Sequence, residues 1–349
     1  MAYVNENLNN SELYFQTKIY TGTGSTLALT LDGTENMQPD FVWIKSRSDS
    51  LSHALFDVIR GVTKVLNSNA TTAEYTNTDT LTAFGTDGFT IGNNTGVNTS
   101  GQTRVAWCWK AGGTASSNSD GSITTSVSAN STSGMSILAY TGTGSGSATI
   151  GHGLGVKPKI LLTKPRNITD PWILWFDPNN SGTSIGRLTL NSTDAQSTSS
   201  NSMINFNTTT ITLPSLSNDA WSGTNNYIGY AFAEKKGYFS SGTYEGNGNE
   251  NGPYIHLGFS PALVVCKEID DTGYYAVSDN KRDGYNLTKN LYWNDSMSES
   301  TANQIDHCAN GFKIRSSAGS HNQSGSTHIY MAWAQSPFVN SNGVPTNAR

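Results

Sequence analysis

Short apolar runs, each bounded by Gly, Pro, Asn or Asp, recur along the whole chain. "FVWIK" (41–45) and "ILLTK" (160–164) are nearly continuous apolar runs, as in strands that are buried on both faces. In "VAWCWKA" (105–111) small and aromatic residues alternate with a period of two, which is typical of a strand in a sandwich core. No stretch shows a clear amphipathic helix period. The pattern therefore predicts an all-β protein.

The apolar runs return in the same order three times. An opening run ends in Tyr-x-Gly-x-Gly in "FQTKIYTGTG", "MSILAYTGTG" and "FSSGTYEGNG", which begin at Phe15, Met135 and Phe239. A block that begins with proline follows ("PDFVWIKSR", "PKILLTKPR", "PALVVCKEI"), and four more blocks follow it in each copy. The first copy leads the second by about 120 residues and the second leads the third by about 100 in every block. This steady offset predicts three copies of one unit.

The copies define the expected domain organisation. Six or seven short strands in roughly 100 residues is the size of an antiparallel β-sandwich, and a jelly-roll or lectin-like form is preferred. The stretch 113–134 is rich in Gly and Ser and is expected to be a linker, although its "SITTSVSA" alternates as an edge strand does. The sequence therefore predicts three tandem sandwich units with an N-terminal arm, a linker and a C-terminal tail: 1–14, 15–112, 113–134, 135–237, 238–338 and 339–349.

Composition narrows the class of partner. Charged residues are 13% of the chain and the net charge is −5, which argues against binding to nucleic acid or to an anionic membrane. No apolar run is long enough to span a membrane. The start of the chain has no apolar signal-peptide region, so synthesis in a cytoplasm is expected. The 3 Cys residues show no C-x-x-C spacing, which implies neither a disulfide framework nor a zinc site.

Several matched polar residues have both a functional and a structural interpretation. Glycines after an apolar run can cradle phosphate, but short β blocks rather than a helix follow them, which favours a turn. Three matched aspartates suggest acid–base chemistry, calcium binding or strand-end caps. Three matched lysines suggest substrate binding, charges that guard a sheet edge or stems packed over that edge. Presence in every copy favours the structural alternative, so no catalytic residue, cofactor or metal is predicted. These residues are Asp57, Asp177, Asp279, Lys45, Lys164 and Lys267.

Aromatic residues in polar loops are the predicted binding residues. Trp172 and Tyr274 stand at corresponding places between the second and third blocks, and Trp221 lies in the loop "SNDAWSGTNN". Sugar rings stack on such aromatics and form hydrogen bonds with the polar residues around them. The alternative is that these rings pack beneath their own loops.

The blocks also carry a family resemblance. "PDFVWIKSRSDS", "GFTIG", "VAWCWKAGG", "DGSITTSVSAN" and "IYMAWAQSPF" resemble an uncharacterised repeat domain of marine bacteriophage structural proteins, over about 14–338. The resemblance implies a virion component and lends no catalytic residue. We expect a tail-fibre or head-fibre appendage that adheres to a host surface glycan. The alternatives are a capsid or tail decoration protein that cements its neighbours, and a polysaccharide depolymerase.

The expected partners follow from this setting. The arm 1–14 is expected to bind other virion proteins, so that deletion of residues 1–12 abolishes incorporation into particles. Host carbohydrate is the expected external ligand. Phage fibres are commonly trimers, and symmetric homo-oligomers are the general rule. A homotrimer is therefore one expectation, and a monomer whose three units mimic a trimer is the other.

Overall fold

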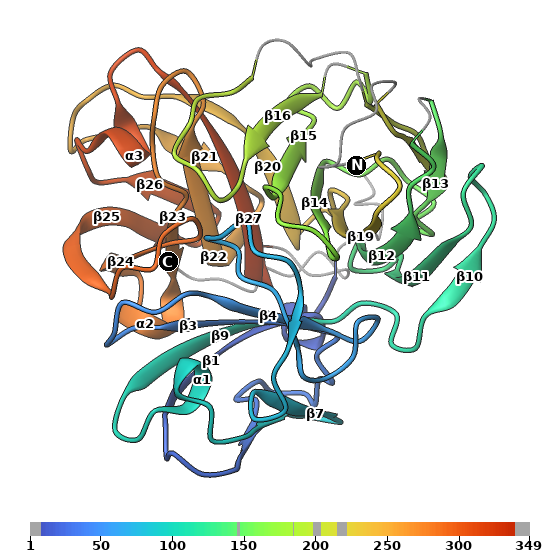
Figure 1. Ribbon diagram of the computed structural model, residues 1–349. Helices are drawn as coiled ribbons and strands as arrows, with labels where there is room; N and C mark the ends of the chain where they lie inside the picture. The colour runs from blue at the N-terminus through green and yellow to red at the C-terminus, as the bar shows by residue number, and fades with distance from the viewer. Residues whose placement is uncertain (1–7, 145–146, 184, 198–203, 215–221, 339–349) are drawn as a thin grey trace.

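The structure is a computed structural model that describes residues 8–144, 147–183, 185–197, 204–214 and 222–338 (Figure 1). Strands dominate it, and its named strands pair antiparallel. The helices of the described residues are a 3-10 turn at Ser11–Leu13 and three four-residue helices, α1 (Thr95–Asn98), α2 (Asn280–Asp283) and α3 (Gly319–Asn322). The predicted all-β class is confirmed.

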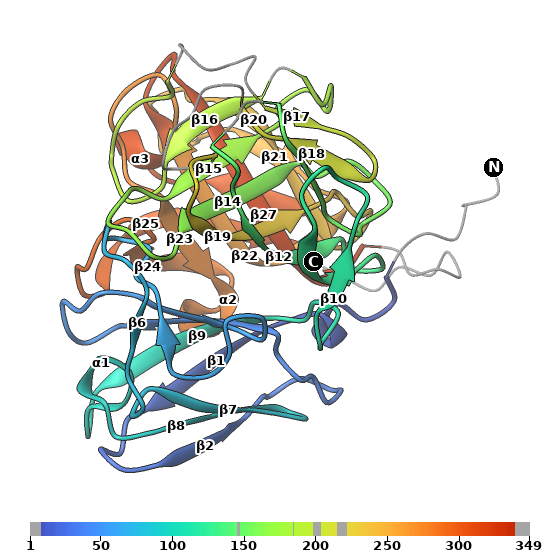
Figure 2. The same ribbon diagram turned by 45° about the vertical axis from the view of Figure 1, so that its right-hand side comes forward.

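The N-terminal part of the chain forms a four-stranded sheet with a smaller sheet packed on its outer face (Figure 2). Every residue of the strand "FVWIKS" is buried because both its faces are covered. Val42 and Ile44 enter the cluster between the two sheets, whereas Phe41 and Trp43 enter a central cluster. In sheet order the strands are β1 (Phe15–Thr21), β9 (Thr103–Trp109), β3 (Phe41–Ser46) and β4 (Ala54–Asp57); then β2 (Leu27–Thr30), β8 (Gly88–Ile91) and β7 (Leu81–Gly85); and the pair β5 (Lys64–Val65) and β6 (Tyr75–Thr76).

The middle part forms a seven-stranded sheet and a three-stranded sheet. Its strand "ILLTKP" is again wholly buried: Leu161 enters the cluster between these sheets, and Ile160 and Leu162 enter the central cluster. The stretch expected as a linker contributes two strands to the larger sheet. In sheet order the strands are β10 (Ser116–Asn118), β11 (Thr125–Asn130), β12 (Met135–Thr141), β19 (Asn226–Phe232), β14 (Ile160–Pro165), β15 (Ile173–Phe176) and β16 (Gly186–Thr189); then β13 (Thr149–Gly151), β18 (Thr210–Thr212) and β17 (Asn205–Phe206).

The C-terminal part forms one eight-stranded sheet that curls into a nearly closed, barrel-like arrangement. Its longest strands pair with each other, and the pairing shifts at Pro261, which has no N–H to give to the ladder. In sheet order the strands are β20 (Phe239–Glu245), β27 (Thr327–Pro337), β22 (Phe259–Glu268), β23 (Ala276–Asp279), β24 (Asn286–Tyr292), β25 (Ser300–Cys308), β26 (Gly311–Ile314) and β21 (Tyr254–His256).

One strand order recurs in the three large sheets. It reads β1-β9-β3-β4 in the first, β12-β19-β14-β15 in the second and β20-β27-β22-β23 in the third. The pairing is also in the same register, because the first residue of the first strand in each order lies opposite an aromatic residue of the second strand. These pairs are Phe15 with Trp109, Met135 with Phe232, and Phe239 with Trp333.

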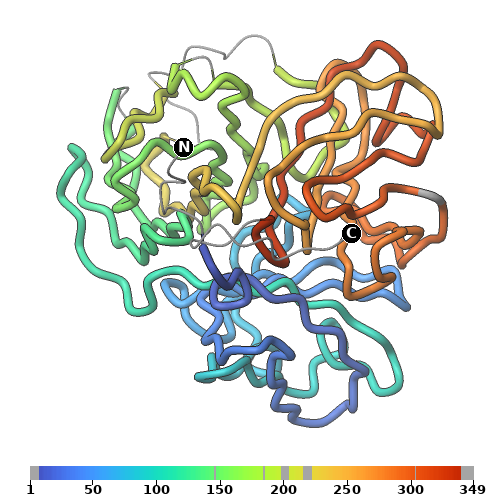
Figure 3. Tube along the Cα trace, turned by 180° about the vertical axis from the view of Figure 1, so that it is seen from behind, coloured from blue at the N-terminus to red at the C-terminus, as the bar shows by residue number. Residues whose placement is uncertain are grey.

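The three large sheets share one central core. Trp109, Phe232 and Trp333 meet there, with ring centroids 6.3, 5.5 and 5.3 Å apart. The cluster that contains them draws buried residues from the N-terminal, middle and C-terminal parts alike. Figure 3 shows these parts as three lobes around a common centre. Burial of such large aromatic surfaces is a main source of stability, so the lobes depend on one another.

The Tyr-x-Gly-x-Gly motif forms a tight turn in each part. Its first glycine leaves no room for a side chain, since a Cβ would lie 2.2, 1.9 and 2.2 Å from a main-chain oxygen at Gly22, Gly142 and Gly246. Its second glycine has a φ of 72°, 70° and 66° at Gly24, Gly144 and Gly248, a region that favours glycine. This geometry agrees with the interpretation of the motif as a turn.

Candidate binding groove

The two predicted sugar-binding aromatics that the structure describes, Trp172 and Tyr274, do not form a shared exposed surface. Trp172 is fully buried, and its indole N–H donates to the carbonyl oxygen of Asn67, 2.9 Å away in the N-terminal part. Tyr274 is half-buried, and its ring lies 4.5 Å from that of Tyr292. Trp221 lies outside the described residues. Trp172 therefore has no face open to a ligand.

Trp172 also corresponds to a different tyrosine from the one expected. Its main-chain N–H donates to the side-chain oxygen of Asn191 over 2.8 Å. The same bond is made at 2.9 Å by Tyr275 with Asn294. Tyr275 is buried like Trp172. The matched position is thus a structural aromatic, and Tyr274 lies one residue before it.

The three matched lysines are fully buried. Lys45, Lys164 and Lys267 have no exposed surface. Two of their ammonium groups donate to carbonyl oxygens in another part of the chain, at 3.1 Å to Ser296 from Lys45 and at 3.2 Å to Thr71 from Lys164. Burial lowers the pKa of each lysine to about 8, because the charged form loses its water. Lys45 and Lys164 therefore join parts of the chain, and none of the three lysines guards a sheet edge, because each lies on an interior strand.

The matched aspartates are also structural, and only two of them match. Asp57 and Asp279 form buried ion pairs with the arginines three residues later. They hold the same strand position, opposite Phe41 and Leu263. In the middle part Phe176 takes that position, and the next residue, Asp177, accepts hydrogen bonds from the N–H groups of a following turn.

Two bidentate ion pairs join different parts of the chain. The guanidinium of Arg166 donates to both carboxylate oxygens of Glu74, over 3.1 and 2.9 Å. Arg47 and Glu299 make the same arrangement over 2.9 and 2.9 Å. In each pair the glutamate N–H also donates to the arginine carbonyl oxygen, over 2.7 and 2.8 Å. We call these contacts, between the end of the second block of one part and a loop of another, the seams.

A third seam has the main-chain hydrogen bond but no ion pair between an arginine and a glutamate. The N–H of Gln196 donates to the carbonyl oxygen of Ile269 over 2.8 Å. Sequence reasoning missed all three seams, although a signal was available. The second block ends in arginine in two copies and in isoleucine in the third, and the facing residue changes from glutamate to glutamine with it.

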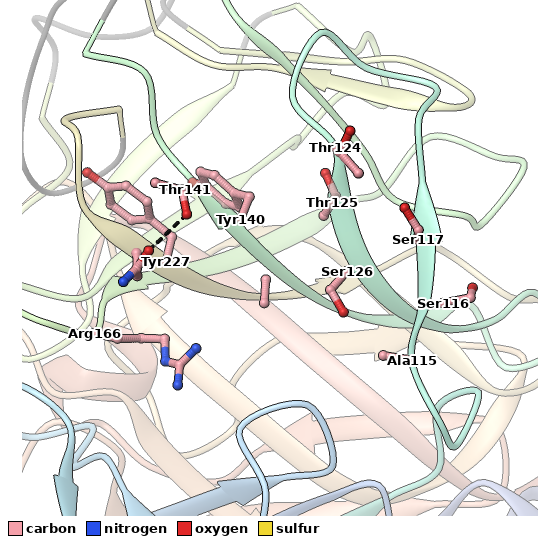
Figure 4. Close-up of a pocket in the computed structure, with 12 residues that line it drawn as sticks. Ala115, Ser116, Ser117, Thr124, Thr125, Ser126, Tyr140, Thr141, Arg166 and Tyr227 are labelled. Atoms are coloured by element: carbon pink, nitrogen blue, oxygen red, sulfur yellow. Dashed lines mark hydrogen bonds between the residues drawn. The ribbon is translucent and has the colours of Figure 1, made fainter.

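A polar groove opens where β11 parts from β12 (Figure 4). β11 pairs with β12 as far as Ser126, opposite Ala139, whereas β12 continues to Thr141 beside β19. The segment before β11 turns to the smaller sheet, where the N–H of Ile123 donates to the carbonyl oxygen of Thr149 over 3.0 Å. The two strands therefore diverge, and the space between them is about 380 Å³.

Hydroxyl and amide groups line this groove. On one side lie Ser116, Ser117, Thr124 and Ser126 of the β10–β11 hairpin, all exposed. Facing them are the exposed side chains of Thr141 and Asn226, whose oxygens lie 2.8 Å apart in a hydrogen bond, and the guanidinium of Arg166 stands at the lower end in Figure 4. The buried rings of Tyr140 and Tyr227 stack at 4.9 Å beside them. The groove thus offers many neutral donors and acceptors and one cation.

A metal site and a reactive thiol have little support in the part of the chain that the structure describes. It contains no group of three or more His, Cys, Asp or Glu side chains that could hold a metal ion. Burial raises the pKa of Cys266 to about 12 and raises that of Cys108, so these thiols are not activated nucleophiles. Among the described helices, none is long and apolar enough to cross a membrane.

Comparison with known proteins supplies a family and no function. No curated protein matches the chain, and no solved structure matches it. A family model with the description "Domain of unknown function (DUF7483)" matches residues 10–337, which is nearly all of the described chain. The chain therefore belongs to the DUF7483 family.

Proposed function

We propose that the chain is a structural component of a bacteriophage particle that adheres to carbohydrate on the host surface. The observation that carries this proposal is the shared core, in which three sheets of one strand order meet through Trp109, Phe232 and Trp333. The proposal includes a finer description of the fold. The segments 15–112, 135–237 and 238–338 are tandem β-sandwich units around an approximate threefold axis, so one chain builds what many fibres build from three chains.

The seams support a cyclic arrangement. Arg47 joins the first unit to the third, Arg166 joins the second to the first, and Ile269 joins the third to the second. Each unit thus uses the same edge toward its neighbour, as subunits of a cyclic trimer do. A rigid block of low charge that needs no disulfide suits a protein that folds in a cytoplasm and acts outside the cell. The phage setting itself rests on the resemblance of the repeated blocks.

The groove supports adhesion to a polyhydroxylated ligand. Sugar hydroxyls donate and accept hydrogen bonds, and Ser117, Thr124 and Asn226 offer both kinds of group at an exposed surface. No carboxylate is among the described residues that line it. Glycoside hydrolysis uses a pair of carboxylates, so binding is favoured over cleavage.

A glycan array tests the adhesive function. The labelled protein should bind a defined glycan, and Thr141→Ala combined with Asn226→Ala should weaken that binding at least about tenfold, because two of the groove's polar contacts are lost. Thr132→Ala, an exposed change outside the groove, is the matched control. Binding to no glycan, together with tight binding to other particle proteins, would support a decoration protein instead. Release of reducing ends from host polysaccharide would support a depolymerase.

The N-terminal arm is proposed to attach the protein to the particle. Its described end is already docked, since the N–H and hydroxyl groups of Thr34 donate to the carboxylate of Glu12 over 2.9 and 3.0 Å. Deletion of residues 1–12 should abolish incorporation into particles. Unchanged incorporation would contradict this role.

A further inference from the structure

The first strands of the three large sheets differ in one respect. β12 has β11 on its outer side, so both its edges are paired. β1 and β20 hold the same place in their sheets, yet within the described residues each is the terminal strand and pairs on one side only. The outer edge of the first strand is thus paired in the middle sheet and unpaired in the other two sheets, as far as the described residues show.

Three residues of β20 direct their main-chain N–H and carbonyl groups toward this edge. The N–H of Gly246 donates to the carbonyl oxygen of Ser326, and the carbonyl oxygen of Tyr238 accepts from the N–H of Ala334, so the even-numbered residues of β20 form the hydrogen bonds with β27. In an antiparallel ladder the main-chain groups of the odd-numbered residues then face away from β27, toward the open edge. Phe239 exchanges hydrogen bonds with Lys235, which closes that end. The N–H and carbonyl groups of Ser241, Thr243 and Glu245 have no strand partner among the described residues. Thr243 and Glu245 are exposed, whereas Ser241 is buried.

β20 has few of the devices that usually protect a strand edge. Such devices are short length, proline, a bulge, an inward lysine or another charged side chain, and of these β20 has the charge of Glu245 alone. β20 is 7 residues long, contains no proline and pairs with β27 without a register shift. The described edge strands β10 and β16 have only 3 and 4 residues. β1 is as long as β20, but its edge residues Thr17 and Ile19 are buried and half-buried, whereas Thr243 and Glu245 of β20 are exposed. β20 is therefore the most open edge that the described residues offer.

We propose that the edge of β20 from Ser241 to Glu245 receives an extended segment of a partner protein as an added antiparallel strand. β11 shows which chemistry fits, because it occupies the corresponding edge of β12 with small residues, Ser126 and Ser128, at the hydrogen-bonded positions. The partner segment has small residues opposite Ser241 and Thr243. It has a basic residue opposite Glu245, the one charge on β20. Main-chain hydrogen bonds give the affinity and these side chains give the selectivity.

The side chains near Gly242 indicate which residue fits the middle of the partner segment. Gly242 has no side chain, and a Cβ there would lie 2.9 Å from the hydroxyl of Tyr330. In the filled sheet the corresponding place is Leu138, and Val127 lies opposite it. A short aliphatic residue in the partner segment, opposite Gly242, therefore packs beside the ring of Tyr330. The proposal does not depend on the carbohydrate function of the groove.

A labelled peptide tests the proposal on the full chain. The probe copies Ile123–Ala129 with Thr124 replaced by lysine, because Thr124 comes opposite Glu245 when the β11 register, which ends at Ser126 in the protein, is continued two residues further along β20. Fluorescence anisotropy should show saturable binding. Thr243→Pro removes one N–H donor at an exposed edge position where proline is tolerated, and it should weaken binding at least about tenfold. Thr243→Ala keeps the N–H and should bind as the wild type does.

A second variant keeps the test decisive if the proline variant does not fold. Glu245→Lys leaves the main chain intact and should weaken binding of the lysine peptide several-fold at low salt, with less effect at high salt. Absence of saturable binding to the wild type, or equal binding by Thr243→Pro, would overturn the proposal. Self-association of the protein that Thr243→Pro abolishes would also overturn it, because the occupant of the edge would then be a second copy.

Discussion

Replacing Lys164 with methionine should change how stability depends on pH. The pKa of Lys164 falls from 10.5 to about 8 on folding because the ammonium group is buried. The unfolded chain therefore holds the proton more tightly, and wild-type stability rises as the pH increases from 8 toward 10.5. The lowered pKa costs about 3 kcal/mol of stability at low pH, at about 1.4 kcal/mol per pKa unit. About 2 kcal/mol of this cost is removed as the pH rises from 7 to 9.5.

Urea unfolding followed by tryptophan fluorescence measures this effect. The free energy of unfolding of Lys164→Met minus that of the wild type should be about 2 kcal/mol larger at pH 7 than at pH 9.5. Buried tyrosines such as Tyr140 and Tyr230 have raised pKa values, so folding loses stability above about pH 10. This loss is common to both proteins and cancels in their difference. Lys281→Met, at an exposed lysine, is the matched control.

If the free energy of unfolding of Lys164→Met differs from that of the wild type by the same amount at both pH values, the ammonium group of Lys164 is not poorly solvated in the folded protein. Lys45 and Lys267 have the same lowered pKa, so their methionine variants should repeat the result.

Three further predictions follow from the core, the seams and the buried histidines. Trp333→Ala should cost about 3–5 kcal/mol of stability and should lower the denaturation midpoint of the whole chain, because the cavity opens in a core that all three lobes share; a separate, unshifted transition of one lobe would contradict this. Arg166→Ala should cost about 1–3 kcal/mol, because Glu74 loses its bidentate partner at a site with little exposure, whereas Arg315→Ala at an exposed ion pair should cost less than about 1 kcal/mol; equal costs in urea unfolding would count against the seam. Stability should fall as the pH drops from 6.5 toward 4, because the unfolded chain takes up protons before the buried rings do, and denaturation midpoints that stay constant from pH 7 to pH 4.5 would rule this out. The pKa values are lowered by burial to about 3, about 4 and about 3 at His53, His307 and His321.

The strand pattern was readable from the sequence because period and turn residues are local properties. "FVWIKS" and "ILLTKP" have an apolar pattern that fits burial on both faces, and both strands are wholly buried. The recurring strand order also lies along the blocks found by self-comparison. What covers each face is not local. Trp172 follows a proline in a polar loop, so it looked exposed, yet another part of the chain lies over it.

The buried charges and the groove were less accessible to sequence reasoning. A lysine at the end of a strand usually reaches solvent, and only the packing of one part on another buries Lys45 and Lys164. A shift of one residue between the strand that ends at Phe176 and its counterparts placed Asp177 in the wrong match. The groove depends on the divergence of β11 from β12, which is a property of the tertiary pairing.

The central claim is that this chain is part of a phage particle and builds a trimer-like block within one polypeptide. Its most direct test is a cryo-EM map of purified particles from the genome that encodes the chain, with quantitative mass spectrometry of the same preparation. We expect the chain to be present in the particles and each density to be a three-lobed block formed by a single copy. Absence of the chain from the particles, or a block built from three copies, would contradict it.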